Sequence, residues 1–105
     1  MIQQAQIDDL VGKIVENFQP EKVILFGSYA DGKPTDDSDL DLMIVMRFKG
    51  KGFVKAAEIM NRISPRVPVD LIVKSPAEIR RRLKWKDMFI TQVLDRGKLL
   101  YEARG

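Results

Sequence analysis

The sequence contains no histidine and no cysteine among its 105 residues. Without histidine, Ser-His-Asp and Cys-His catalysis, most zinc sites and any ordinary imidazole base are excluded. Without cysteine, disulfides and thiol-ligated metals are excluded as well. Any chemistry that this chain performs must therefore depend on carboxylates and on hard metal ions that prefer oxygen ligands.

Long apolar runs are also missing. No segment approaches the roughly 18 apolar residues that a membrane span needs, and the N-terminus, MIQQAQIDD, lacks the basic and apolar regions of a signal peptide. We therefore expect a cytoplasmic protein with no contact with a membrane. The length predicts a single domain, residues 1–105, with room for one sheet and a few helices.

Charge is unevenly distributed along the chain, although the net charge is only +3. Five of the 15 acidic residues fall between Asp31 and Asp41. The segment from Lys74 to Lys86 is instead basic and includes Arg80, Arg81 and Arg82. An acidic pocket beside a basic face suits a metal site with a polyanionic substrate or partner. For the basic segment itself, a solvated helix face is the simpler interpretation, and direct binding of nucleic acid is the less favoured one.

Hydrophobic periodicity and turn residues predict alternating helices and strands. The predicted elements are a helix from Ile7 to Phe18, a strand at about 22–27, a strand beginning near Asp39 and including Leu42–Met46, a helix from Phe53 to Ile63, a strand at 67–73, a helical region from Ser75 to Gly97 with a bend or break near Trp85, and a short edge strand at 98–102.

The stretch from Val23 to Met46 organises the predicted sheet. Its first apolar run stops at Gly27-Ser28, and its second begins directly after Asp39 and Asp41. The connection between them is too short for an ordinary parallel crossover, so we expect these two strands to be antiparallel. The longer connection to the third strand contains a helix and allows a parallel crossover. Gly27-Ser28, Asp39, Asp41 and Asp70 are then expected at one end of the sheet.

Asp39 and Asp41 are spaced i, i+2, so their side chains point to the same side of the strand. Two like charges held side by side are costly unless a cation lies between them. Together with Asp70, they could hold one or two Mg²⁺ ions, about 3.5–4 Å apart when there are two. Gly27 would let the backbone approach a phosphate, the Ser28 hydroxyl would donate a hydrogen bond to it, and Asp70 would assist deprotonation of an acceptor hydroxyl.

The residues Phe26-Gly27-Ser28, then Ser38-Asp39-Leu40-Asp41-Leu42, then a later strand aspartate, Asp70, resemble the G-S…D-x-D…D signature of the DNA polymerase β-like nucleotidyltransferases. The short chain and its closing Gly97-Lys98-x-Leu100-Tyr101-Glu102 resemble the minimal nucleotidyltransferases of prokaryotes. This resemblance implies an α/β (α+β) polymerase β-like fold with a mixed, mostly four-stranded sheet flanked by helices. It also implies a Mg²⁺-dependent enzyme that transfers an NMP, most simply AMP from bound ATP, to a hydroxyl.

The resemblance also implies a partner protein. Many minimal members are antitoxins paired with a helical HEPN-domain toxin ribonuclease, and some inactivate that toxin by adding AMP to a tyrosine. We expect the same toxin–antitoxin role here, within a homo- or hetero-oligomer, because 105 residues leave no room for a separate acceptor-binding domain.

One residue departs from the family pattern. Many relatives carry arginine in the turn after Gly-Ser, where this chain has Asp31. Lys33 lies two residues further on, and we expect it to replace that arginine as the cation that binds phosphate. Asp31 favours an alternative hypothesis, a binding module that keeps the fold and neutralises its partner by contact alone. A second alternative is a nucleotidyltransferase that acts on a small molecule, such as an antibiotic hydroxyl.

Overall fold

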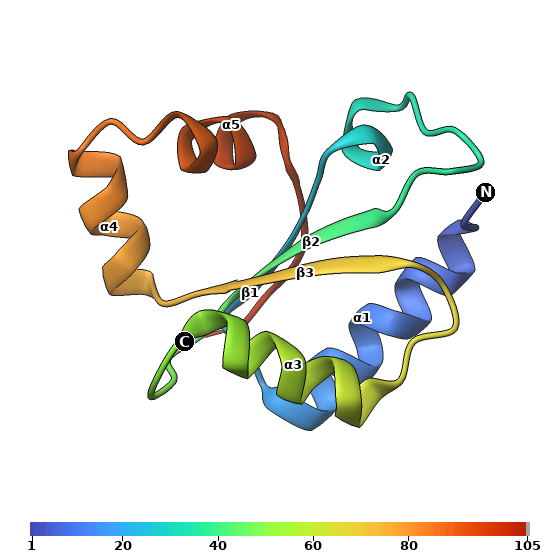
Figure 1. Cartoon of the computed structure of the whole chain (residues 1–105), viewed down its shortest axis with the longest axis horizontal. Helices are drawn as coiled ribbons and strands as arrows, with labels where there is room; N and C mark the ends of the chain where they lie inside the picture. The colour runs from blue at the N-terminus through green and yellow to red at the C-terminus, as the bar shows by residue number, and fades with distance from the viewer. Residues whose placement is uncertain (105) are drawn as a thin grey trace.

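A computed structural model describes residues 1–104 as one sheet with helices on both of its faces (Figure 1). In chain order the elements are α1 (Gln4–Phe18), β1 (Lys22–Phe26), α2 (Ser28–Asp31), β2 (Leu40–Val45), α3 (Gly52–Ile63), β3 (Val69–Lys74), α4 (Pro76–Lys84), α5 (Met88–Arg96) and β4 (Lys98–Glu102). Every helix within residues 1–104 falls short of the length and apolarity needed to cross a bilayer.

The sheet has four strands in the order β3-β2-β1-β4. The predicted antiparallel pairing of β1 with β2 is confirmed, as is the predicted parallel pairing of β2 with β3. The predicted edge strand is β4, which pairs antiparallel with β1. The sheet is therefore mixed. The last residue of β1 and the first residues of β2 and β3 lie at the same end of the sheet, and we call this end of the strands the edge of the candidate site.

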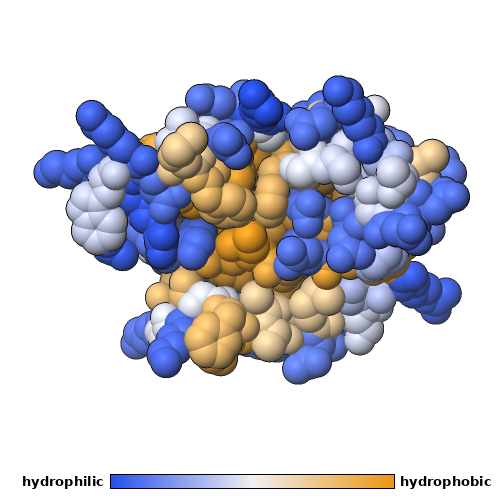
Figure 2. All heavy atoms as spheres, turned by 45° about the horizontal axis from the view of Figure 1, so that its top comes forward, coloured by the Kyte–Doolittle hydropathy of each residue, from blue (hydrophilic) through white to orange (hydrophobic). Residues whose placement is uncertain are grey.

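Alternation along the strands divides the interior into two clusters. The larger cluster lies between the sheet and helices α1 and α3, and it contains Leu40, Leu42 and Ile44 of β2. The smaller cluster lies on the opposite face, where Met43 and Val45 pack with residues of α5. Because Asp41 is in phase with Met43 and Val45, its side chain belongs to this second face. Figure 2 shows an apolar hollow on this side of the molecule, bordered by hydrophilic side chains.

The predicted helical region from Ser75 to Gly97 is two helices, and the predicted break near Trp85 is confirmed. The first helix starts as its sequence indicates, because the Ser75 hydroxyl accepts a hydrogen bond from the Glu78 backbone N–H at 3.1 Å. Lys86 adopts a left-handed conformation with φ 59°, which turns the chain between the helices. Asp87 then caps α5 by accepting a hydrogen bond from the Ile90 backbone N–H at 3.0 Å. The chain thus makes a corner between α4 and α5.

Candidate active site

Two of the predicted carboxylates lie side by side across the parallel pair of strands. Asp41 of β2 is in register with Asp70 of β3, and it is also the register partner of Phe26 at the end of β1. Register neighbours in adjacent strands point to the same face of a sheet. The structure therefore brings Asp41, Asp70 and the residue preceding Gly27 together at one edge, as the connection lengths predict.

Asp39 lies just before β2 and belongs to the same group of charges. Asp39 and Asp70 are exposed, whereas Asp41 is half-buried. Burial raises the pKa of the Asp41 carboxyl, and the negative charges of Asp70 and Asp39 raise it further. No lysine or arginine within residues 1–104 forms an ion pair with any of these three carboxylates. The edge therefore carries concentrated negative charge with no cation of the protein to balance it.

Gly27 packs directly against Asp41. It adopts φ 75° and ψ −155°, a backbone conformation that favours glycine, and a Cβ built at this position would collide with the Asp41 Oδ2 atom. Glycine is therefore required both for the turn after β1 and for the close approach of the backbone to this carboxylate. The next residue, Ser28, begins the single-turn helix α2 and is half-buried beside the same edge.

Among the predicted site residues, Lys33 has the weakest link to the three carboxylates and the Gly27 turn. Its backbone N–H donates a hydrogen bond to the Ser28 carbonyl oxygen at 3.0 Å, and its side chain is exposed. Within the described residues, its side chain takes part in no ion pair or hydrogen bond with the carboxylates. Its predicted contact with phosphate stays a prediction.

A cavity of about 150 Å³ adjoins the edge, and its lining includes Phe89 and Arg96, which the sequence did not indicate as site residues. Phe26 and Phe89 pack edge to face there, with their ring centroids 5.6 Å apart at an interplanar angle of 86°. Asp31 and Arg96 also line it, so an acidic and a basic side chain contribute to the same wall. The amphipathic pattern of α5 is typical of any surface helix, and only the packing of α5 against β1 brings Phe89 and Arg96 to this place.

Carboxylates are suitable ligands for a hard divalent cation, but these three do not form a complete cage. Across residues 1–104, no three acidic side chains converge closely enough to hold a metal ion by themselves. Mg²⁺ is usually bound through one or two carboxylates together with substrate phosphates, rather than by a site made only of protein ligands. The unbalanced charge at Asp39, Asp41 and Asp70 therefore fits a cation that is shared with a bound polyphosphate.

Comparison with known proteins agrees with this geometry. The family model described as polymerase beta, nucleotidyltransferase, matches residues 9–104. A protein of Methanocaldococcus jannaschii, named as a candidate protein adenylyltransferase, is 32% identical over 83 residues, which cover 77% of this chain and 78% of the relative.

Solved structures show the same fold. A candidate nucleotidyltransferase from Sulfolobus solfataricus aligns with a TM-score of 0.65 and 25% identity, over 93% of this chain and 78% of that chain. A toxin–antitoxin complex crystallised with AMP-PNP contains a chain that aligns with a TM-score of 0.58 and 19% identity, over 92% of this chain and 74% of that chain. At this identity, the second likeness shows the fold alone.

Members of the matched family typically use divalent metal ions, which agrees with a carboxylate edge that the protein leaves without a cation. The family model spans residues 9–104, and the M. jannaschii relative aligns with 77% of the chain. The expected α/β fold with a mixed four-stranded sheet is confirmed as well. The protein therefore belongs to the polymerase beta family of nucleotidyltransferases.

Proposed function

We propose that this chain transfers AMP from ATP to a hydroxyl group of a partner protein, in a reaction that depends on Mg²⁺. The hydroxyl oxygen bonds to the α-phosphorus, and the bond from that phosphorus to the β-phosphate oxygen breaks, which releases pyrophosphate. The observation that carries the proposal is the register of Asp41 with Asp70, beside a glycine turn that packs on Asp41. At this edge the negative charge of Asp41 and Asp70 lies next to the Gly27 backbone, which a phosphate can approach closely. Such an arrangement suits phosphoryl chemistry, in which positioning and charge neutralisation provide most of the catalysis.

In this proposal, Asp39, Asp41 and Asp70 are the ligands for one or two Mg²⁺ ions. The bound metal would neutralise charge on the phosphates and align them with the attacking hydroxyl. Asp70 is exposed at the rim, where an acceptor can reach it, and it assists removal of the hydroxyl proton. Gly27 and Ser28 bind the phosphates, and Lys33 contributes a cation from the adjacent loop.

We also assign Arg96 a role in binding ATP. Asp31 stands where many relatives have arginine, and Arg96 lines the same small cavity beside Gly27. A guanidinium that reaches the cavity from α5 would supply the positive charge that the turn lacks. Arg96→Gln should therefore weaken binding of ATP by about tenfold or more, the usual effect of losing one charge-assisted hydrogen bond.

The acceptor is best assigned to a protein. The M. jannaschii relative is named as a candidate protein adenylyltransferase, and proteins of toxin–antitoxin pairs share the fold. Large apolar side chains are exposed on the surface, including Phe53, which is 71% exposed, and Met88, which is 74% exposed. Such side chains suit docking of a second protein. We propose that this partner is a HEPN-type toxin and that the chain acts as its antitoxin.

Mass spectrometry of the partner tests the proposal. The purified chain, its co-purifying or neighbouring gene product, Mg²⁺ and ATP are incubated together, and the partner should gain mass in units of AMP. Asp39→Asn should abolish the gain, whereas Asp37→Asn, a charge-matched change at an exposed turn position, should preserve it. Absence of an adduct with every NTP tested, while Asp39→Asn still neutralises the partner, would contradict the enzymatic proposal.

Asp31 favours a second candidate function, neutralisation of the partner by contact alone. An anion in the turn after Gly27-Ser28 opposes binding of phosphate, and this loss would matter little to a protein that acts only by docking. In that case the carboxylate variants would neutralise the partner as well as the wild type does, and the partner would keep its unmodified mass.

A further inference from the structure

The corner between α4 and α5 carries a concentration of cations around an exposed aromatic ring. We call the surface formed by Arg80, Arg81, Lys84, Trp85 and Lys86 the basic corner. All five residues are exposed, and the Trp85 side chain is 68% exposed. Exposure of a large indole ring to water is unfavourable, and burial of the ring on a ligand would lower the free energy. The basic corner therefore needs an explanation outside the hydrophobic core.

Arg81 lies over the Trp85 ring, with its guanidinium carbon 5.7 Å from the ring centroid. Arg80 and Lys84 are one helical turn apart, so they project from α4 beside this pair. The flat ring and the flat guanidinium group are thus held together at the surface by a cation–π contact. Planar groups of this kind are the surfaces on which nucleic acid bases stack.

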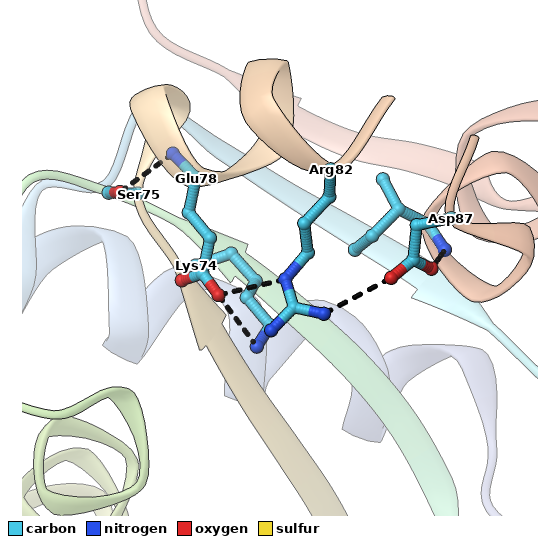
Figure 3. A network of polar contacts seen from close by, with 6 residues as sticks. Lys74, Ser75, Glu78, Arg82 and Asp87 are labelled. Carbon is cyan, nitrogen blue, oxygen red and sulfur yellow. Dashed lines mark hydrogen bonds and ion pairs between the residues drawn. The ribbon is translucent and has the colours of Figure 1, made fainter. Parts of the chain in front are cut away.

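The cations of the basic corner form no ion pairs with the acidic residues of α4 and α5, two helices that the structure describes in full. Glu78 binds Arg82 at 3.0 Å and Lys74 at 3.4 Å, and Asp87 binds the other side of Arg82 at 3.1 Å (Figure 3). These acidic side chains are therefore engaged inside a network that joins α4 to α5. In the part of the chain that the structure describes, no acidic side chain forms an ion pair with a cation of the basic corner.

The orientation of α4 argues against a membrane surface as the ligand. Its apolar residues Ile79 and Leu83 line a cavity together with Ile24 of the sheet, and Arg80 lines the same cavity. The apolar side of α4 is therefore turned toward the sheet, although Leu83 stays 40% exposed. A helix that lies on a bilayer turns its apolar face outward, into the lipid. Outside this cavity the exposed residues Arg81 and Lys84 are cationic, which suits a polyanion in water.

The basic corner is also well separated from the carboxylates. Asp70 lies at the beginning of β3, whereas α4 follows the other end of that strand (Figure 1). A polyanion bound at the corner would therefore avoid the negative edge formed by Asp39, Asp41 and Asp70.

We propose that the basic corner binds single-stranded nucleic acid. Arg80, Lys84 and Lys86 contact the phosphates, and one base stacks on Trp85 beside Arg81. The proposal assigns a ligand to a surface at the opposite end of β3 from the active site, and it does not depend on transfer of AMP.

Fluorescence gives a direct test, because Trp85 is the only tryptophan in the chain. Titration with single-stranded RNA, and with DNA of the same sequence, should quench its emission saturably. Affinity should fall as salt rises, with a log–log slope of about −2 for three phosphate contacts to a single strand. The Lys84→Gln, Lys86→Gln double variant should reduce the magnitude of that slope by about 1.4.

A matched variant keeps the test specific. Lys13→Gln with Arg66→Gln removes the same amount of charge at the cavity beside α1, and it should leave the slope unchanged. Trp85→Leu, followed by anisotropy of a labelled strand, should weaken binding by about tenfold or more through loss of the stacked base.

Four outcomes would overturn the proposal. The first is the absence of quenching by either strand. The second is equal binding of poly-glutamate, which carries charge but no bases. The third is tighter binding of anionic vesicles than of the single strands. The fourth is a Trp85→Leu variant with wild-type affinity.

Discussion

At the scale of single residues, Gly27 explains why the site cannot tolerate a side chain in the turn after β1. Its left-handed φ and its contact with Asp41 Oδ2 are separate requirements, and a second glycine allows them to be separated experimentally. Gly32 also has a positive φ, 74°, with a ψ of 20° where Gly27 has −155°, and nothing lies within 4 Å of a Cβ built there.

Gly27→Ala is expected to reduce transfer of AMP by about 100-fold, because displacement of Asp41 by about an ångström misplaces a reacting group. Gly32→Ala should destabilise the fold by about 1–2 kcal/mol through its left-handed backbone. Gly27→Ala should destabilise the fold by more, because its added Cβ must also displace Asp41. Thermal denaturation and the transfer assay together separate strain from chemistry. Equal activity of the two variants would show that the contact with Asp41 is unimportant.

At the scale of elements, Arg82 holds the corner between α4 and α5 together. Burial opposes ionisation of Glu78, but the hydrogen bond from Arg82 and the charge of Lys74 outweigh it and lower the pKa of Glu78. The backbone N–H of Ile90, followed by Arg82, lowers the pKa of Asp87. Both carboxylates are thus ionised more readily in the folded protein than in the unfolded chain.

Because the pKa values of both carboxyls are lowered in the folded protein, we predict that acid destabilises the corner between α4 and α5. The stabilisation is fully present above the ordinary pKa values of 4.5 for Glu78 and 3.8 for Asp87, and it is lost as the pH falls through the lower folded values. Hydrogen exchange should therefore show loss of protection over residues 76–90 before α1 is affected.

Two variants provide the controls for this prediction. Arg82→Gln should expose residues 76–90 to exchange even at neutral pH and should remove most of the pH dependence. Arg80→Gln removes a neighbouring cation that has no ion pair within residues 1–104, so it should behave like the wild type. Simultaneous loss of protection in α1 and at the corner would contradict a local role for the network.

The elements themselves were largely predictable from the sequence, because their signals are local. Ser75, Pro76 and Glu78 mark the start of α4, and the lengths of the connections predicted how β1, β2 and β3 pair. The break near Trp85 was predicted without its mechanism, since the left-handed Lys86 and the cap at Asp87 depend on chain geometry that the helical pattern does not encode.

At the scale of the whole molecule, the prediction of the candidate site was less complete. The topology brings Asp41 and Asp70 together, as predicted, because both lie on strands whose order the connections constrain. Phe89 and Arg96 were missed because they reach the cavity through the packing of α5 against β1, which joins residues far apart in the chain. No local pattern distinguishes them from ordinary surface positions of an amphipathic helix.

The two ends of β3 carry charge of opposite sign. Asp70 and its neighbouring carboxylates lie at one end, and the strand leads at its other end into α4 and the basic corner. This separation suits attraction of cations at one end of β3 and, as proposed for the basic corner, of polyanions at the other end. Because the net charge is only +3, composition alone gives no indication of this arrangement.

The central claim is that Asp39, Asp41 and Asp70 hold Mg²⁺ jointly with the phosphates of ATP, and thermal denaturation of the isolated chain tests it most directly. A ligand that binds only the folded state at about 100 times its Kd stabilises that state by about 2.7 kcal/mol, which raises the Tm by about 10 °C or more for a domain of this size. We predict this increase with Mg²⁺ and ATP together, but not with either alone and not in Asp41→Asn. An equal increase with ATP and a chelator, or in Asp41→Asn, would contradict the claim.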